Sequence, residues 1–335
     1  MGKQEFYFQW HFTNTCNLQC THCYQEGYNF PNLEPSELLC IAKEITATLD
    51  KWNMLGRISL TGGEPFMSPN LFDLLDYFEN DDHIKQLDIL TNGTCINDAS
   101  LEKLKKYNKL RQIQISLDGA TEATHNMVRG HGAYNKVKEA IRLLKQNGID
   151  VSLMFTLMRS NMSEAVQIID FAEKHDVSAV TVERVTPCGN SSISDILSAE
   201  EIREIYNAIT IRANSINSEL AVRRLRPLWI HTEPLNICKN SKIGGFCPVG
   251  FTSMAILWDG TVLPCRRLNI PIGNVLEEKL FYIWYTSDVL WRIRDKNNLQ
   301  GKCHNCNDIG RCGGCRAIAY ETTGNYMGED IQCWK

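Results

Sequence analysis

The chain has 335 residues, 43% of them hydrophobic, and its 35 basic and 39 acidic side chains give a formal net charge of −4. This balance gives no general basic field for nucleic acid, and the sequence has neither an apolar run of the roughly 18 residues that span a membrane nor an amino-terminal signal core. We therefore expect a cytoplasmic protein without nucleic-acid or membrane partners, long enough for more than one domain. In such a chain, 14 cysteines indicate metal binding or redox chemistry rather than disulfides.

In chain order, the first two-thirds of the sequence alternates predicted strands with predicted helices. The expected strands are 6–13, 57–60, 86–90, 112–117, 151–157 and 179–185. The expected helices are 35–52, 70–78, 98–107, 134–146, 163–175 and 198–216. Repeated strand–helix order predicts parallel strands with helical crossovers, and a closed barrel needs eight such units. The six units therefore predict an α/β fold, an open partial (β/α)6 barrel similar to a TIM barrel.

Segments that could carry chemistry follow five of these strands, at 16–23, 62–65, 91–93, 116–119 and 187–189. Parallel strands end at the same edge of a sheet, so we expect these segments to meet at one rim. The sites of such folds lie at that rim, and the sequence therefore predicts the active site there.

The first of these segments, 16–23, contains three cysteines in eight residues: Cys16, Cys20 and Cys23. A structural zinc ion usually takes four ligands, and so does a four-iron cluster that only transfers electrons. Three thiolates on one loop therefore indicate a four-iron cluster with one iron left open. The alternative is that Cys20 and Cys23 form half of a zinc site.

The spacing Cys16-x3-Cys20-x2-Cys23 resembles the signature of the radical S-adenosylmethionine (SAM) enzymes, whose fold is a partial six-unit barrel. The resemblance implies that the amino and carboxylate groups of SAM chelate the open iron. Electron transfer from a flavodoxin- or ferredoxin-type reductant would then yield methionine and a 5′-deoxyadenosyl radical, which abstracts hydrogen from the substrate.

The resemblance also implies a set of residues that bind SAM. These are His22 beside the adenine, Gly62, Gly63, Glu64 and Pro65 at the methionine amino group, Ser116 and Asp118 at the ribose, and Arg129 at the carboxylate. The two glycines would let the backbone approach the ligand closely, and the Glu64 carboxylate can accept a hydrogen bond from an ammonium group.

The last third of the chain differs in composition, because eight of the 14 cysteines fall between Cys238 and Cys333. This change predicts a barrel domain at 1–217, a bridging segment at 218–237 and a loop-rich domain at 238–335. The cysteine spacing resembles the SPASM domain of peptide-modifying radical SAM enzymes, which binds two auxiliary four-iron clusters.

Carried over residue by residue, the resemblance implies three four-iron clusters in all. The first auxiliary cluster would take Cys238, Cys247, Cys265 and Cys315, and the second Cys303, Cys306, Cys312 and Cys333. Because Cys238 lies outside the core of the pattern, an open iron on the first auxiliary cluster is also compatible with the sequence. The alternative for this domain is one or two zinc sites.

The leading functional prediction is an oxidoreductase-type maturase that modifies a ribosomally synthesised precursor peptide. The modification would be a cross-link, a thioether or an epimerised centre. Cys16 lies near the start of the sequence, so we expect the barrel and SPASM surfaces, or another protein, to hold the peptide. One alternative is action on a small molecule in tetrapyrrole or cofactor biosynthesis. An alternative of another class is a non-catalytic electron-transfer or metal-scaffold protein.

Two further residues are predicted to act on the substrate. Arg266 follows Cys265 at the position where sulfatase-maturing relatives have an aspartate base, and a permanent cation there suits a carboxylate of the substrate. Cys188, after the sixth predicted strand, is a candidate hydrogen-atom donor to the substrate radical, as in epimerases of this superfamily. The alternatives are an exposed charge at Arg266 and a small buried side chain at Cys188.

Overall fold

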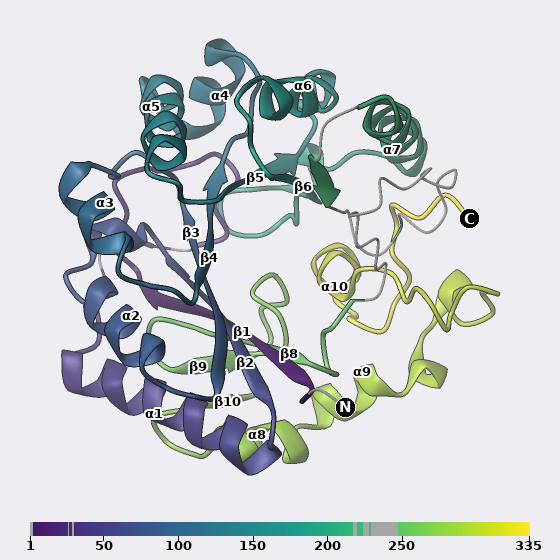
Figure 1. The fold of residues 1–335 in the computed structure, drawn as a ribbon. Coiled ribbons are helices and arrows are strands. Elements are labelled where there is room, and N and C mark those ends of the chain that lie inside the picture. The colour runs from purple at the N-terminus through teal and green to yellow at the C-terminus, as the bar shows by residue number, and fades with distance from the viewer. Residues whose placement is uncertain (1–2, 26, 29, 217–219, 224–227, 229–246) are drawn as a thin grey trace.

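The computed structural model describes residues 3–25, 27–28, 30–216, 220–223, 228 and 247–335. In these residues a ten-stranded sheet has the order β10-β9-β8-β1-β2-β3-β4-β5-β6-β7. The six predicted strands are present and parallel, as β1 (Glu5–Thr13), β2 (Leu55–Gly62), β3 (Ile84–Thr91), β4 (Leu110–Ser116), β5 (Val151–Leu157) and β6 (Ala179–Arg184). The sheet curves into an open barrel (Figure 1), which confirms the predicted fold class.

Helices cover the outer face of the barrel (Figure 1). The predicted helices are present as α1 (Pro35–Trp52), α2 (Leu71–Glu79), α3 (Asp98–Leu104), α5 (Ala133–Gln146), α6 (Gln167–Lys174) and α7 (Ala199–Asn214). Among the described helices and strands up to residue 223, α4 (Glu122–Arg129) before α5 and the short β7 (Ala221–Arg223) beside β6 were not predicted. None of the described helices is long and apolar enough to cross a membrane.

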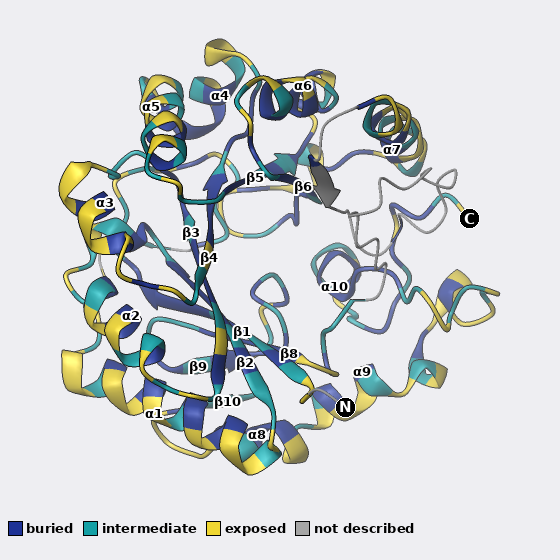
Figure 2. Ribbon diagram, in the orientation of Figure 1, coloured by how far each residue is buried: buried dark blue, intermediate teal, exposed yellow. Residues whose placement is uncertain are grey.

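The hydrophobic core lies between the sheet and these helices (Figure 2). In β1, Phe6, Phe8 and Trp10 are at most 1% exposed and belong to the same core as the apolar face of α1. At the start of that helix, the Glu34 backbone N–H donates to the Glu37 carboxylate at 2.9 Å. One face of each strand is therefore fixed toward the helices, which leaves the opposite face for the barrel interior.

The carboxyl-terminal region continues the barrel sheet. β8 (Ser253–Ile256) pairs in parallel with β1, with Ser253 opposite Tyr7, and β9 (Thr261–Leu263) and β10 (Gly273–Asn274) follow in antiparallel order. Three short helices complete this region, α8 (Leu280–Thr286), α9 (Asp288–Arg294) and α10 (Arg316–Thr323). The predicted bridge 218–237 lies mostly outside the described residues, so the predicted domain division stays a prediction.

A buried ion pair joins β6 to the segment that follows α10; α10 lies on the open side of the barrel (Figure 1). The Arg184 guanidinium, at the end of β6, donates two hydrogen bonds to the Asp330 carboxylate, at 2.8 and 3.1 Å, and a third to Gln332. Both charged side chains are at most 2% exposed. The carboxyl-terminal region is thus joined to the barrel through strand pairing at one edge and through buried charge at the other.

Candidate active site at the carboxyl ends of the barrel strands

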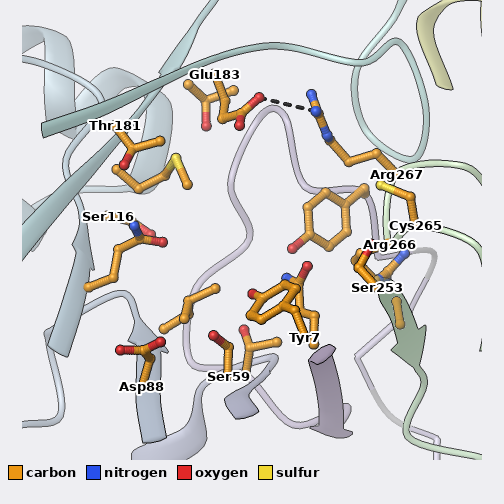
Figure 3. A pocket seen from close by; sticks show the side chains of 18 of the residues that line it. Tyr7, Ser59, Asp88, Ser116, Thr181, Glu183, Ser253, Cys265, Arg266 and Arg267 are labelled. Atoms are coloured by element: carbon orange, nitrogen blue, oxygen red, sulfur yellow. Dashed lines mark ion pairs between the residues drawn. The ribbon is translucent and has the colours of Figure 1, made fainter. Parts of the chain in front are cut away.

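The interior of the barrel is a cavity of about 1040 Å³. Side chains from β1 to β6, from β8 and from the segment after β9 surround it (Figure 3). Many are polar, among them Tyr7, Ser59, Asp88, Ser116, Thr181, Glu183 and Ser253. Packed side chains fill the centre of a closed eight-stranded barrel. The interior of this barrel is instead not filled, and its polar side chains supply the hydrogen-bonding groups of a substrate site.

The polar lining has a signal in the sequence that the predictions above did not use. Parallel strands buried on both faces normally have continuous apolar sequences. In β1, however, Tyr7 and Gln9 alternate with buried aromatic residues, and in β4 Gln112 and Gln114 alternate with buried isoleucines. All four polar residues line the cavity. This alternation in the inner barrel strands could have identified the cavity wall.

The predicted cluster loop lies at the carboxyl end of β1, and Cys16, Cys20 and Cys23 all line the cavity. The end of β2 supports it, because the Gly63 backbone N–H donates to the Thr13 carbonyl at 2.8 Å. A Cβ atom at Gly63 would overlap the Thr15 carbonyl, so glycine is required there for close approach. The first two residues of the segment 62–65 therefore position the cysteine loop as well as line the cavity.

The segment after β6 supports the same loop from another side. The Asn190 backbone N–H donates to the Cys23 carbonyl at 2.8 Å, and its side-chain amide donates to the Cys20 carbonyl at 3.0 Å. Cys188 lies in this segment but is not among the described residues that line the cavity, whereas Thr186 is. The role of Cys188 as a hydrogen-atom donor stays a prediction.

Asp118 is the centre of a buried polar network behind the cavity wall. Its carboxylate accepts from Arg129 Nε at 2.6 Å, from His22 Nε2 at 2.7 Å and from the Thr156 backbone N–H at 2.8 Å. Burial alone would raise the pKa of this carboxyl, but Arg129 and His22 hold it well below its usual range. The structure therefore gives Asp118 three protein partners, and its predicted ribose contact stays a prediction, while Ser116 does line the cavity.

Arg129 combines this anchor with access to the cavity. Its Nη1 atom lies 3.7 Å from the Cys20 sulfur, and the residue lines the cavity at the end of α4. Burial would lower the pKa of Arg129, but the Asp118 carboxylate raises it above the ordinary value, so the guanidinium is permanently charged. It is thus a fixed cation beside the cysteine loop, and its predicted contact with the SAM carboxylate stays a prediction.

Glu64 and Pro65 lie behind the wall rather than on it. The buried Glu64 carboxylate accepts from Thr91 Oγ1 at 2.6 Å, from the Asn92 backbone N–H at 2.7 Å and from the Phe66 backbone N–H at 3.1 Å. Pro65 is buried and opens a short 3-10 turn. Within the predicted SAM set, the residues on the wall are His22, Gly62, Gly63, Ser116 and Arg129.

Three cysteines of the predicted first auxiliary set face the same cavity, namely Cys247, Cys265 and Cys315. Burial raises the pKa of Cys247 to about 12, with a further increase from the nearby thiols of the other two. Such thiols need a metal to hold them as thiolates, because metal coordination displaces the proton. This donor set therefore fits an iron–sulfur group, and its fourth predicted member, Cys238, lies outside the described residues.

The predicted second auxiliary set lies away from the cavity. Burial raises the pKa of Cys312 and of Cys333, and a neighbouring thiol adds to each increase, Cys303 for Cys312 and Cys312 for Cys333. The fourth predicted member, Cys306, donates its backbone N–H to the Cys303 carbonyl at 3.5 Å.

The spacing of the described cysteines bears on the zinc alternative. Within the described part of the chain, no three His, Cys, Asp or Glu side chains converge closely enough to hold one metal ion. Ligands of one zinc ion all lie within about 2.3 Å of it, whereas each thiolate of a four-iron cluster binds a different iron.

Arg266 and Arg267 line the cavity beside Cys265 (Figure 3). The Arg266 guanidinium stacks on the ring of Tyr24, 4.2 Å from its centroid, and its Nε donates to His11 Nδ1 at 3.0 Å. Burial and this arginine lower the pKa of His11 well below its usual value, so His11 is a neutral acceptor. The predicted substrate contact of Arg266 stays a prediction, since its guanidinium already has these partners.

Two family models match the chain. The model of the radical SAM superfamily matches residues 10–172, and that of SPASM, an iron–sulfur cluster-binding domain, matches residues 247–307. The first match contains Cys16, Cys20 and Cys23, and the second contains four of the predicted auxiliary ligands, Cys247, Cys265, Cys303 and Cys306.

Individual relatives match over most of the chain. The AdoMet-dependent heme synthase of Methanosarcina barkeri is 27% identical over 342 residues, which cover 97% of this chain and 95% of that protein. The antilisterial bacteriocin subtilosin biosynthesis protein AlbA of Bacillus subtilis is 27% identical over 330 residues, which cover 94% and 68%. Streptococcus suis SuiB bound to precursor peptide SuiA shares the fold, with a TM-score of 0.77 and 20% identity over 99% of this chain and 76% of that one.

Proposed function

The chain belongs to the radical SAM superfamily and carries a SPASM domain, and we propose that this enzyme acts on a tetrapyrrole with carboxylate side chains. The observation that carries this proposal is the barrel cavity, since about 1040 Å³ with both apolar and polar side chains on its wall suits an apolar macrocycle with polar side chains. The similarity to AdoMet-dependent heme synthase over 95% of that protein supports it. The peptide substrate expected from the sequence is less well supported, because AlbA matches over only 68% of its length.

The two matched domains imply four-iron clusters and SAM. Three clusters are part of the proposal, with Cys16, Cys20 and Cys23 as ligands of the first and the two carboxyl-terminal sets as ligands of the others. The first cluster and SAM, when bound, supply a 5′-deoxyadenosyl radical that abstracts hydrogen from a side chain of the substrate.

The residues of the chain would bind and orient the reactants. Arg129, held by Asp118, would bind the SAM carboxylate, and His22, held by the same carboxylate, would lie beside the adenine. The backbone of Gly62 and Gly63 would contact the methionine amino group. The remaining volume, between this rim and the amino ends of the strands, would hold the macrocycle.

The test is turnover by the anaerobically reconstituted and reduced enzyme. With iron coproporphyrin III, a porphyrin that bears propionate side chains, we expect 5′-deoxyadenosine together with a change in porphyrin mass, measured by mass spectrometry. We expect about twelve irons per chain from three clusters. The proposal fails if the porphyrin mass is unchanged while 5′-deoxyadenosine forms, or if the protein binds zinc and no iron.

Peptide modification is the second candidate, and the similarity to AlbA favours it. The same assay separates the two functions when a precursor peptide replaces the porphyrin. A loss of two hydrogens from the peptide would indicate a cross-link, and deuterium incorporation without a change in composition would indicate epimerisation. Either result, with no change in the porphyrin, would favour the peptide.

A further inference from the structure

The cavity extends through the barrel to the amino ends of its strands. There its wall includes Glu5 in β1, Arg57 in β2, Lys85 in β3 and Arg111 in β4. Arg57 precedes Gly62, at the other end of β2, by five residues, which is about 16 Å at 3.3 Å per residue. The cavity therefore has two ends, with cysteines at one and basic side chains at the other.

The basic side chains outnumber the acidic partners at this end. Lys85 forms an ion pair with Glu5, whereas Arg57 Nε lies 3.9 Å from the same carboxylate, too far for a hydrogen bond. This Nε is buried and has no hydrogen-bond partner in the described structure. One carboxylate is therefore shared by two cations, and one of their donors is unsatisfied.

Arg111 adds a third cation. It is exposed, and no ion pair to it is found among the described residues. The next carboxylate along the wall is Asp88, which accepts from the Gln86 side-chain amide at 2.9 and 3.0 Å. Among the described residues, three cations thus face two carboxylates at the amino end, which leaves an excess of positive charge there.

The arginines at the cysteine end differ, because each already has a protein partner. Arg129 binds Asp118, Arg267 binds Glu183 at 3.1 Å, and Arg266 binds the neutral His11. A negatively charged group of the substrate would have to displace these contacts. At the amino end, the Arg111 guanidinium and the half-exposed side chain of Arg57 can bind such a group without breaking a hydrogen bond to a described residue.

We propose that Arg57 and Arg111, with the charge of Lys85 beside them, bind carboxylate side chains of the substrate at the edge of the macrocycle opposite the reacting one. This inference rests on the proposed function. Guanidinium groups match carboxylates with two parallel hydrogen bonds, which fixes orientation as well as position. The separation of about 16 Å is comparable with the breadth of a porphyrin with its side chains. These residues therefore determine which edge of the substrate faces the cysteine loop.

The test compares porphyrin binding by wild type and by a triple variant with Arg57→Gln, Lys85→Gln and Arg111→Gln. The probe is iron coproporphyrin III, titrated anaerobically into the reconstituted enzyme and followed by its Soret band. We expect at least tenfold weaker binding and a smaller dependence on ionic strength. Arg111→Gln alone changes an exposed side chain without an ion pair in the described structure, so it tests the proposal in a variant whose folding is not at risk.

The matched control is Lys106→Gln. Lys106 is exposed, lies just before β4 at the same end of the barrel, and does not line the cavity, so this variant should bind as wild type does. Wild type should also bind the fully amidated porphyrin at least tenfold more weakly. If wild type turns over iron coproporphyrin III, but the triple variant and Arg111→Gln bind it as tightly as wild type does, the inference fails while the proposed function stands. If wild type neither binds nor converts the porphyrin, both fail.

Discussion

Replacing Asp330 with asparagine tests how the carboxyl-terminal region is joined to the barrel. Asp330 is fully buried and holds the buried Arg184 through two hydrogen bonds, and its carboxylate also accepts from the Cys315 backbone N–H at 2.8 Å. Asparagine has nearly the same volume but no charge, so the change leaves the Arg184 cation buried without its counter-ion. Breaking such a pair from one side costs about 3–5 kcal/mol of folding stability, against about 0–1 kcal/mol for an exposed pair.

The assay is anaerobic unfolding of the reconstituted enzyme in guanidinium chloride, followed by tryptophan fluorescence and by the iron–sulfur absorbance. Asp170→Asn is the matched control, because Asp170 is half-exposed and its partner Arg212 also binds Glu173. We expect the control to lose less than about 1 kcal/mol. Replacing both Arg184 and Asp330 with apolar residues should recover much of the loss, since no charge is left buried. The reasoning is refuted if Asp330→Asn costs no more than Asp170→Asn.

Three further changes test the site. Gly63→Ala should lower the iron content by about four per chain, because the added Cβ would overlap the Thr15 carbonyl of the cysteine loop. The control is Gly310→Ala, which should keep all its iron because no described atom lies near the added Cβ. Arg129→Gln should raise the dissociation constant of SAM at least tenfold by equilibrium dialysis, since a charged hydrogen bond contributes about 1.5–3 kcal/mol; unchanged affinity would exclude the assigned contact. Cys247→Ala should also lose about four irons, and full iron content would exclude Cys247 as a ligand.

The barrel could be predicted because its signals are local. Apolar periodicity located six strands and six helices within a few residues of their observed bounds. α4 was missed because its eight residues include only two large apolar side chains, Met127 and Val128, of which Met127 is exposed. β8 was missed because a strand of four residues is identified by its pairing with β1, and that pairing joins residues about 250 positions apart.

The position of the cysteine loop was predictable, whereas the polar network around it was not. Cysteine spacing is visible in the sequence, and it identified the loop that faces the cavity. The partners of Asp118 come from three separate segments, and no short pattern encodes that a buried carboxylate has its acceptor positions filled. The same holds for Arg266, whose contact with His11 joins residues 255 positions apart.

The barrel and the carboxyl-terminal region depend on each other for the burial of their charges. Arg184 of β6 has its counter-ion in Asp330, and Arg267 has its counter-ion in Glu183 of β6. A buried charge without a partner is strongly destabilising, so a barrel ending at residue 216 would leave Arg184 buried or force β6 to expose it. The Arg184–Asp330 pair also positions part of the cavity wall, because the Asp330 carboxylate accepts a hydrogen bond from the backbone N–H of Cys315. The contacts that stabilise the interface therefore hold Cys315, a predicted auxiliary ligand, on the same cavity as Cys16, Cys20 and Cys23.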